Sequence, residues 1–274
     1  MRRHFVGIKE IFEKEKIEYF SARTISLCDM RRPDFVERRG FDPEKIKTAV
    51  VFLIPYGVTG EEGNISLYAR PRDYHGYCDG LFSRICPMLS EEYGGTFLGF
   101  ADKSPVEETD LALRSGLCVR GDSYVVINEK YGSFVFIGEI LTDVPASRLG
   151  FSGEASEIGE CIHCGACRRA CPMKNGRECL SAVTQKKGEL TEDERDYIIE
   201  NGSVWGCDIC QTVCPMNKNA ESTPIEYFRE ERIPRLSREI IDGMSNEEFA
   251  SRAFSWRGKN TVIRNLSLFE NGDK

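Results

Sequence analysis

The sequence has no long hydrophobic run. Its first twenty residues are charged throughout and lack the continuous apolar stretch of a secretory signal. Elsewhere, no uncharged apolar run approaches the ~20 residues that a membrane-spanning helix needs. We therefore expect a cytoplasmic protein without membrane contact.

Basic residues are not in excess either. The 37 Lys and Arg residues stand against 44 Asp and Glu residues, which gives a formal net charge of -7 and a pI near 5.3. A protein whose whole surface follows a phosphate backbone needs the opposite balance, so any binding of nucleic acid must be local. With 274 residues, 41% hydrophobic and 30% charged, the chain has the composition of a soluble globular protein of about two domains.

The first half of the chain mixes helical and strand patterns. Apolar residues at helical spacing predict an amphipathic helix over residues 5 to 17. The apolar run from Ala49 to Ile54 predicts a strand buried on both faces. A helix with Leu81, Ile85 and Leu89 on one face follows, and Pro87 is expected to kink or restart it. These elements predict an α+β domain.

Two further apolar runs, residues 123 to 128 and 133 to 141, flank a turn that contains Gly132. The pattern predicts a β-hairpin. A small, acidic linker after residue 150 indicates a domain boundary near residue 152. Beyond it, Thr191 to Glu194 and Ser245 to Glu248 match the capping-box pattern, so helices should begin there, the first ending near Gly202.

Cysteine, in contrast, is abundant, and eight of the 12 cysteines cluster in the second half. One run reads Cys161-Ile-His-Cys164-Gly-Ala-Cys167-Arg-Arg-Ala-Cys171-Pro172, and a shorter one reads Cys207-Asp-Ile-Cys210-Gln-Thr-Val-Cys214-Pro215. The first is the ferredoxin-type spacing in which three thiolates bind one [4Fe-4S] cluster and the fourth reaches the other cluster. Cys179 is the nearest upstream thiol that completes the second set.

The spacing therefore predicts two [4Fe-4S] clusters. The first is assigned to Cys161, Cys164, Cys167 and Cys214, and the second to Cys171, Cys179, Cys207 and Cys210. Zinc is the alternative, because C-x2-C pairs also build zinc ribbons, but zinc sites close with four ligands and do not use these longer runs. Disulfides are disfavoured because the cysteines are clustered and no secretory signal precedes them.

The remaining cysteines are Cys28, Cys78, Cys86 and Cys118, which are scattered singly and are interpreted as buried free thiols. His163 lies inside the cluster loop, either as a spacer or as a residue that tunes a cluster potential. Six basic residues lie between positions 161 and 187, against the single acid Glu178. They are Arg168, Arg169, Lys174, Arg177, Lys186 and Lys187.

This basic patch has two interpretations. It is a solvated face that offsets the charge of anionic clusters, or it is a docking surface for an acidic electron donor such as ferredoxin or flavodoxin, or for a phosphate-bearing substrate such as tRNA.

Most of the chain resembles the cobalamin-dependent, double-cluster epoxyqueuosine reductases, which finish biosynthesis of the tRNA base queuosine. The segments that carry the resemblance are Tyr68-Ala-Arg-Pro-Arg-Asp-Tyr-His75, Phe100-Ala-Asp102, Arg114-Ser-Gly116, Ile137-Gly138-Glu139, Arg177-Glu-Cys179-Leu-Ser, Trp205 to Lys218, and Arg264-Asn265. What the resemblance implies is a nitroreductase-like, cobalamin-binding N-terminal domain over residues 1–152, a ferredoxin-like cluster domain over 153–220, and C-terminal helices over 221–274.

The resemblance also implies roles for single residues. The clusters would pass electrons to cobalt, and Asp102 would donate the proton. Tyr74, His75, Gly138 and Asp102 would line the corrin pocket. Without the resemblance, Asp102 would be interpreted as a loop or cap aspartate.

Two departures from the family pattern argue for a weaker hold on tRNA. The family's Gly-Lys-Asn stretch reads Gly121-Asp122-Ser123 here, which removes a lysine, and the helical-repeat extension that many members carry does not follow Lys274. The leading hypothesis is a reductase of the epoxyqueuosine reductase type that acts on epoxyqueuosine in tRNA or on a related small substrate. Two alternatives remain: a two-cluster electron-transfer protein, and a reductase that activates the corrinoid of another protein.

Overall fold

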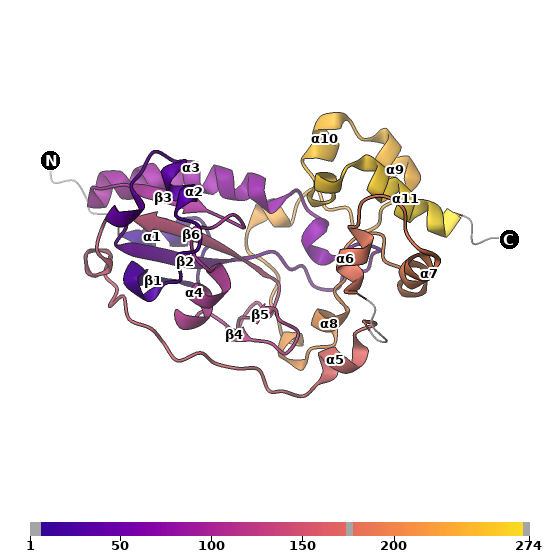
Figure 1. Cartoon of the computed structure of the whole chain (residues 1–274), viewed down its shortest axis with the longest axis horizontal. Coiled ribbons are helices and arrows are strands. Elements are labelled where there is room, and N and C mark those ends of the chain that lie inside the picture. Colours follow the sequence, from indigo (N-terminus) through magenta and orange to yellow (C-terminus); the bar gives the residue numbers. More distant parts are fainter. Residues whose placement is uncertain (1–6, 174–177, 271–274) are drawn as a thin grey trace. The chain divides into compact units, whose positions relative to one another are not determined.

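The computed structural model describes residues 7–173 and 178–270 (Figure 1). The chain forms two compact units. The first comprises Met1–Pro55 and His75–His163, and the second comprises Tyr56–Tyr74 and Cys164–Lys274. The mixed helix and strand composition expected from the sequence is confirmed, while the functional division into residues 1–152, 153–220 and 221–274 stays a prediction.

An antiparallel sheet forms the centre of the first unit, with the strand order β1-β2-β6-β3. Its strands are β1 (Phe20–Thr24), β2 (Thr48–Pro55), β3 (Phe97–Phe100) and β6 (Val135–Thr142). The helices of this unit are α1 (Ile8–Lys14), α2 (Asp34–Glu37), α3 (Tyr74–Tyr93) and α4 (Glu108–Arg114). Short 3₁₀ helices span Ile25–Leu27, Pro43–Lys45 and Ala146–Leu149.

Strand β2 is buried along its whole length, which confirms the strand predicted from its apolar run. Its alternate residues pack on opposite faces of the sheet. Val51 and Leu53 share a core cluster with Leu111 of α4. On the other face, the Phe52 ring lies 5.2 Å from that of Phe12 in α1 and 6.2 Å from that of Phe82 in α3. Helices therefore cover both faces, and Figure 1 shows the long helix α3 beside the sheet.

The hairpin predicted between residues 123–128 and 133–141 is wrong in its pairing. Strand β5 (Val126–Ile127) pairs with β4 (Val119–Arg120), whereas β6 pairs with β2 and β3. A single bridge joins Asn128 to Gly132. The side chain of Asn128 closes the turn, because it accepts from the backbone N–H groups of Lys130 and Tyr131 and donates to Leu117 O. This leaves β6 free to take a central position in the sheet.

Helix α3 runs from Tyr74 to Tyr93 and contains Pro87 inside it, so the restart expected at the proline does not occur. Leu81, Ile85 and Leu89 are fully buried along one face, as predicted. The first helix begins at Ile8 and ends at Lys14, within the expected range.

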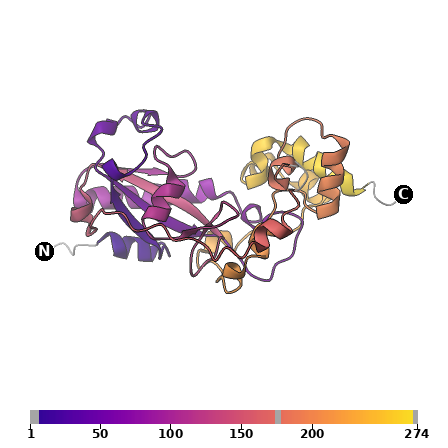
Figure 2. The same ribbon diagram turned by 60° about the horizontal axis from the view of Figure 1, so that its bottom comes forward.

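The second unit is built from short helices around its own core. They are α5 (Ala166–Ala170), α6 (Leu180–Thr184), α7 (Glu192–Asn201), α8 (Ile209–Thr212), α9 (Arg238–Gly243), α10 (Asn246–Ala250) and α11 (Lys259–Glu270). Further 3₁₀ helices span Leu67–Ala69, Pro215–Asn217, Glu226–Phe228 and Ala253–Arg257. The helices α9 to α11, yellow in Figure 2, gather as one group.

Both predicted capping boxes are present, at Thr191 and at Ser245, and α7 ends at the left-handed Gly202 as expected. Among the described residues, no helix combines the length and the apolar character that crossing a membrane requires.

The segment Tyr56–Tyr74 packs in this second unit. Ile65 and Ala69 belong to a core cluster with Trp205 and Phe254. The backbone N–H of Ser66 donates to Trp205 O at 2.8 Å, and the N–H of Val204 donates to Asn64 O at 2.7 Å. An early piece of the chain thus completes a core built mainly from the last hundred residues.

Candidate active site and metal sites

Asp102 lies in the loop between β3 and α4 in the first unit. Its backbone has φ +62°, a left-handed conformation that is uncommon for a residue other than glycine. Its side chain is 60% exposed, and Oδ2 lies 3.7 Å from Nε2 of His75, which is half exposed near the start of α3. The structure therefore brings together two of the residues singled out in the sequence. The distance is long for a hydrogen bond but suits an ion pair with a protonated imidazole.

Tyr74 and Gly138 are the other two residues expected at the corrin. Tyr74 is the half-buried first residue of α3. Gly138 lies in β6 opposite Phe52, and a Cβ at this position would come within 2.5 Å of the Phe52 ring. This contact gives Gly138 a packing role in the sheet. The corrin contacts of Tyr74 and Gly138 stay predictions.

Two carboxyl groups below the Asp102 loop were not singled out from the sequence. Glu139 in β6 is fully buried, and burial raises its pKa well above the usual range. The Ser104 hydroxyl donates to its Oε2. The pKa of Glu108 is raised to about 7. Burial is the main cause, and the nearby charge of Asp102 is the second. An acidic residue inside the apolar run of residues 133–141 was the available signal.

The twelve cysteines of the chain are all free thiols, so the structure agrees with the exclusion of disulfides. In the second unit, Cys167 lies in α5 and Cys171 ends this helix, while Cys179 precedes α6. Cys207 and Cys210 lie just before and within α8, which packs against α5. Cys214 follows α8 and precedes the 3₁₀ helix Pro215–Asn217. Gly165 begins α5 in the left-handed conformation, with φ +70°.

Four of these thiols interact electrostatically. The pKa of Cys210 is raised to about 11. Burial is the largest cause, and the nearby Cys171 and Cys179 add to it. Burial, followed by Asp208, Cys210 and Cys179, raises the pKa of Cys207 to about 11. Groups that influence one another's pKa in this way lie near one another. This set has the composition expected for the second cluster.

Asp208, which lies between Cys207 and Cys210 at the start of α8, anchors this region. Its carboxylate accepts from the Ser66 hydroxyl at 2.5 Å and from the backbone N–H of Leu67 at 2.6 Å. The segment Tyr56–Tyr74 is thereby fixed to the helix that carries Cys210. A cavity of about 370 Å³ adjoins these residues and is also lined by Arg70, Cys207 and Arg235.

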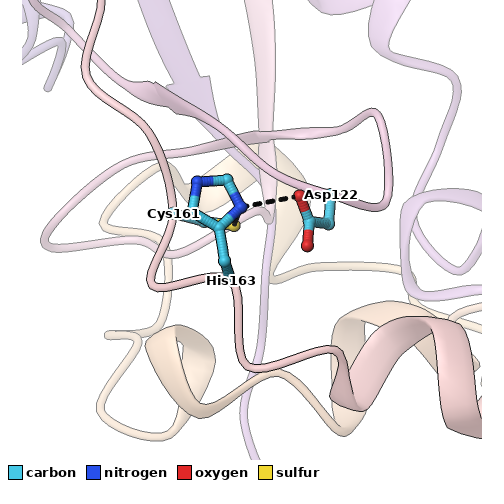
Figure 3. Close-up of side chains that lie close together, drawn as sticks. All are labelled: Asp122, Cys161 and His163. Atoms are coloured by element: carbon cyan, nitrogen blue, oxygen red, sulfur yellow. Dashed lines mark hydrogen bonds and ion pairs between the residues drawn. The ribbon is translucent and has the colours of Figure 1, made fainter.

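His163 belongs to the first unit and is held by two carboxylates. Its Nε2 lies 3.0 Å from Glu160 Oε2, and its Nδ1 lies 2.9 Å from Asp122 Oδ1 and 3.8 Å from Cys161 Sγ (Figure 3). Because ionised carboxylates only accept hydrogen bonds, both ring nitrogens donate, and the bonds to Glu160 and then Asp122 raise the pKa of His163. Residue 122, an expected lysine in the family, thus orients the cluster-loop histidine.

Backbone pairing also fixes the start of this loop. The N–H of Arg120 in β4 donates to Gly159 O at 3.2 Å, and the N–H of Cys161 donates to Arg120 O at 3.1 Å. Asp122, Cys161 and His163 bring their ligand atoms within 4.8 Å of one another. His163 is therefore more than a spacer in the structure, while its effect on a cluster potential stays a hypothesis.

Part of the basic patch makes contacts within the chain, although Arg169, which makes one of them, is exposed. Lys174 and Arg177 lie outside the described residues. Lys186 pairs with Glu194 at 2.7 Å, and Arg169 donates to Cys164 O at 3.0 Å. Arg168 and Lys187 have exposed side chains.

The four isolated cysteines are largely withdrawn from solvent. Cys78 and Cys118 are buried, as interpreted from the sequence, whereas Cys28 and Cys86 are half-buried. Burial raises the pKa of Cys28 to about 11 and those of Cys86 and Cys118 to about 12, which keeps these thiols protonated.

No family model matches the chain. Similar curated proteins do exist. An epoxyqueuosine reductase of Francisella cf. novicida is 34% identical over 198 residues, covering 69% of this chain and 53% of its own length. An epoxyqueuosine reductase of Lactococcus garvieae is 29% identical over 290 residues, covering 92% of this chain and 79% of its own length.

The chain belongs to the epoxyqueuosine reductase family. A crystal structure of a family member with an epoxyqueuosine-modified tRNA-Tyr stem loop has a TM-score of 0.73 to this chain at 24% identity. The match covers 95% of this chain and 80% of that one, and it shows that the two share a fold. The chain spans about half the length of the first curated relatives it matches, 53% and 43%.

Proposed function

We propose that this protein is an iron-sulfur reductase that removes the epoxide oxygen of epoxyqueuosine in tRNA, with Asp102 as the acid. The exposed Asp102 carboxyl group, held opposite His75 in the first unit, carries this proposal. Both residues belong to the segments that resemble the family. A general acid must reach the oxygen that it protonates, and an exposed side chain on a defined backbone meets this requirement.

The reaction sets the parts that the protein must provide. Removing the epoxide oxygen breaks two C–O bonds, forms a C=C bond, consumes two electrons and two protons, and releases water. The electrons come from a low-potential, one-electron donor of the ferredoxin or flavodoxin class. Two clusters, held by the eight cysteines assigned from the sequence, suit the passage of one electron at a time. The proximity of Cys210 to Cys171 and Cys179, and of Cys207 to Cys210 and Cys179, supports the second set.

Cobalamin is the second expected cofactor, on the strength of the family resemblance. When bound, it supplies a low-valent metal centre that acts on carbon. The exposure of His75 and Asp102 fits a ligand at this edge of the sheet, because neither side chain is covered by the unit's own core. We assign corrin contacts to His75 and Asp102, with Tyr74 and Gly138 as further candidates. The nitroreductase-like and ferredoxin-like descriptions of the two domains are part of the same proposal.

Asp102 itself has one task, which is to hold a proton and release it to the departing oxygen. We assign His75, whose Nε2 lies 3.7 Å from Oδ2 of Asp102, the role of orienting this carboxyl group. The bound tRNA is expected to contact the basic patch, whose exposed cations among the described residues are Arg168, Arg169 and Lys187.

The test is anaerobic reconstitution with iron, sulfide and cobalamin, followed by turnover of tRNA that contains epoxyqueuosine. Asp102→Asn should keep the cluster and corrin spectra but reduce the rate ~100-fold or more, as expected for loss of a positioned acid. Asp79→Asn, which changes an exposed aspartate of α3, is the control and should retain the rate.

Two other outcomes would redirect the assignment. Full activity of Asp102→Asn would remove the proposed acid. Intact clusters without any corrin-induced spectral change would instead support the electron-transfer alternative.

A further inference from the structure

The loop that carries Asp102 has a firmly fixed stem. Pro105 O accepts from the backbone N–H groups of Arg31 and Arg32, both at 2.9 Å. The N–H of Glu107 donates to Asp29 O at 3.0 Å, and Met30 forms an antiparallel bridge with Val106. Residues 105–107 are therefore paired like a short strand with residues 29–32.

The tip of the loop, residues 101–104, is held in a different way. Its attachments to the rest of the unit run through side chains, since Asp102 lies 3.7 Å from His75 and Ser104 bonds to a carboxyl group of the sheet. The Ser104 hydroxyl accepts from the N–H of Val106 at 3.1 Å and donates to Oε2 of Glu139. The hold on the tip through Glu139 thus depends on side chains that take no part in the proposed reaction.

Glu139 is an unusual residue for its position. It lies in the central strand β6, between Val51 of β2 and Phe100 of β3, and its side chain is completely buried. Among the described residues, its Oε1 has no hydrogen-bond partner. An ionised carboxylate without a cationic partner is very costly in such surroundings, so the group carries a proton. A buried polar group that is only half satisfied calls for a reason to be there.

We propose that Ser104 and Glu139 form a latch that holds the loop tip and thereby positions Asp102. Glu139 is the fixed part, because it belongs to the sheet, and Ser104 is the moving part. The left-handed backbone of Asp102 is unfavourable for a residue with a Cβ, so a released tip relaxes away from this conformation. Both are positioning residues. The catalytic consequence rests on the proposed function, whereas the latch itself does not.

Amide hydrogen exchange of the complete protein, loaded with clusters, tests the latch without substrate. Ser104→Ala removes the donor, and Glu139→Met removes the acceptor at similar volume. In both, the amides of residues 102–104 should exchange about tenfold faster, the effect of losing one hydrogen bond, while β6 and α4 keep their protection. Unchanged exchange at these amides in Ser104→Ala overturns the proposal, even if Glu139→Met fails to fold.

Two more variants test whether the hydrogen bond itself holds the tip. Glu139→Gln retains an oxygen acceptor and the shape of the neutral acid, so its exchange should match that of the wild type. Exchange as fast as in Glu139→Met would show that a charge, and not the hydrogen bond, holds the tip. Ser115→Ala is the control, because the Ser115 hydroxyl is buried at the far end of α4 without a hydrogen-bond partner.

Turnover measurements distinguish the positioning role of Ser104 from the role of Asp102 as the acid. If Asp102 is the acid, Ser104→Ala should lower kcat about tenfold and leave KM unchanged, because binding is retained while the acid is misplaced. An unchanged kcat in Ser104→Ala, with Asp102→Asn inactive, overturns the positioning role. If Asp102→Asn is fully active, the proposed function fails. The latch is then tested by the amide exchange rates alone.

Discussion

Glu108 titrates near neutral pH because it is largely withdrawn from water and lies near Asp102. Its pKa rises from 4.5 to about 7 on folding. An acid with a raised pKa binds its proton more tightly in the folded protein. The contribution of Glu108 to the free energy of unfolding is therefore most favourable below pH 4.5 and decreases as the pH rises towards 7. Above this window the penalty stays constant, at roughly 3 kcal/mol for such a shift.

Glu108→Gln should remove this penalty. We expect the variant to be more stable than the wild type at pH 8 by up to about 3 kcal/mol, and to differ little from it at pH 4.5. The thermal midpoints of both proteins, measured anaerobically at several pH values, check the prediction. Glu139 contributes equally to both proteins, so the difference isolates Glu108. Parallel pH curves would contradict the assignment.

Some residues of the site can be recognised from their spacing in the sequence, whereas others gain their chemical properties only when the fold buries them. Cys161 to Cys171 and Cys207 to Cys214 are recognisable because cluster geometry demands their separations. Glu139 and Glu108 acquire their properties only from the strands and helices packed around them. An acid inside an apolar run marks Glu139 as a candidate for burial, but nothing local pairs it with Ser104, so the latch was beyond prediction from the sequence.

At the scale of elements, Gly138 of β6 lies directly against the ring of Phe52 in β2. A methyl group there would lie 2.5 Å from the ring of Phe52, which itself packs between α1 and α3. The ring cannot move easily, because helices cover it. The glycine is therefore required by the sheet's own core.

Gly138→Ala should destabilise the protein by about 1–3 kcal/mol, the usual cost of overpacking a core. Phe52→Leu in the same chain should recover part of this loss. Gly243→Ala is the matched control, because a Cβ on this last residue of α9 meets no atom within 4 Å. Thermal midpoints decide the point, and equal midpoints for Gly138→Ala and Gly243→Ala would count against it.

The elements themselves were foreseen unevenly. Strand β2 and the capped helices α7 and α10 follow from patterns within ten residues of sequence. The pairing of β6 does not, because its partners β2 and β3 are distant in the chain and the Asn128 turn competes for the adjacent residues. Strand pairing depends on the whole sheet. Short-range sequence signals therefore predict turns better than they predict which strands pair.

For the whole molecule, metal content is the first quantity to measure. Anaerobically prepared protein should contain about eight iron and eight sulfide per chain, and Cys179→Ala should retain about four of each, because it removes a ligand of one cluster only. Elemental and sulfide analysis check this. Cys78→Ala, at a buried thiol outside the array, should keep the full content. Zinc in place of iron would refute the cluster assignment.

Binding of tRNA should be weak and sensitive to salt, because a chain of net charge -7 depends on few local cations. Arg168→Gln and Lys187→Gln should each weaken binding and reduce the salt slope by about one. Titrations of labelled tRNA at several salt concentrations measure both. Lys9→Gln, at an exposed lysine of α1, should change neither. An identical slope in all four proteins would exclude the patch from binding.

The segment Tyr56–Tyr74 has a consequence for synthesis. When the ribosome has completed the first unit's last residue, His163, the side chains of Ile65 and Ala69 still lack Trp205 and Phe254, which are translated later. The nascent chain therefore carries an apolar loop without its core partners between β2 and α3, which already belong to the first unit. For the same reason, no single cut yields both units intact, and each can be produced alone only by excising or relocating this loop.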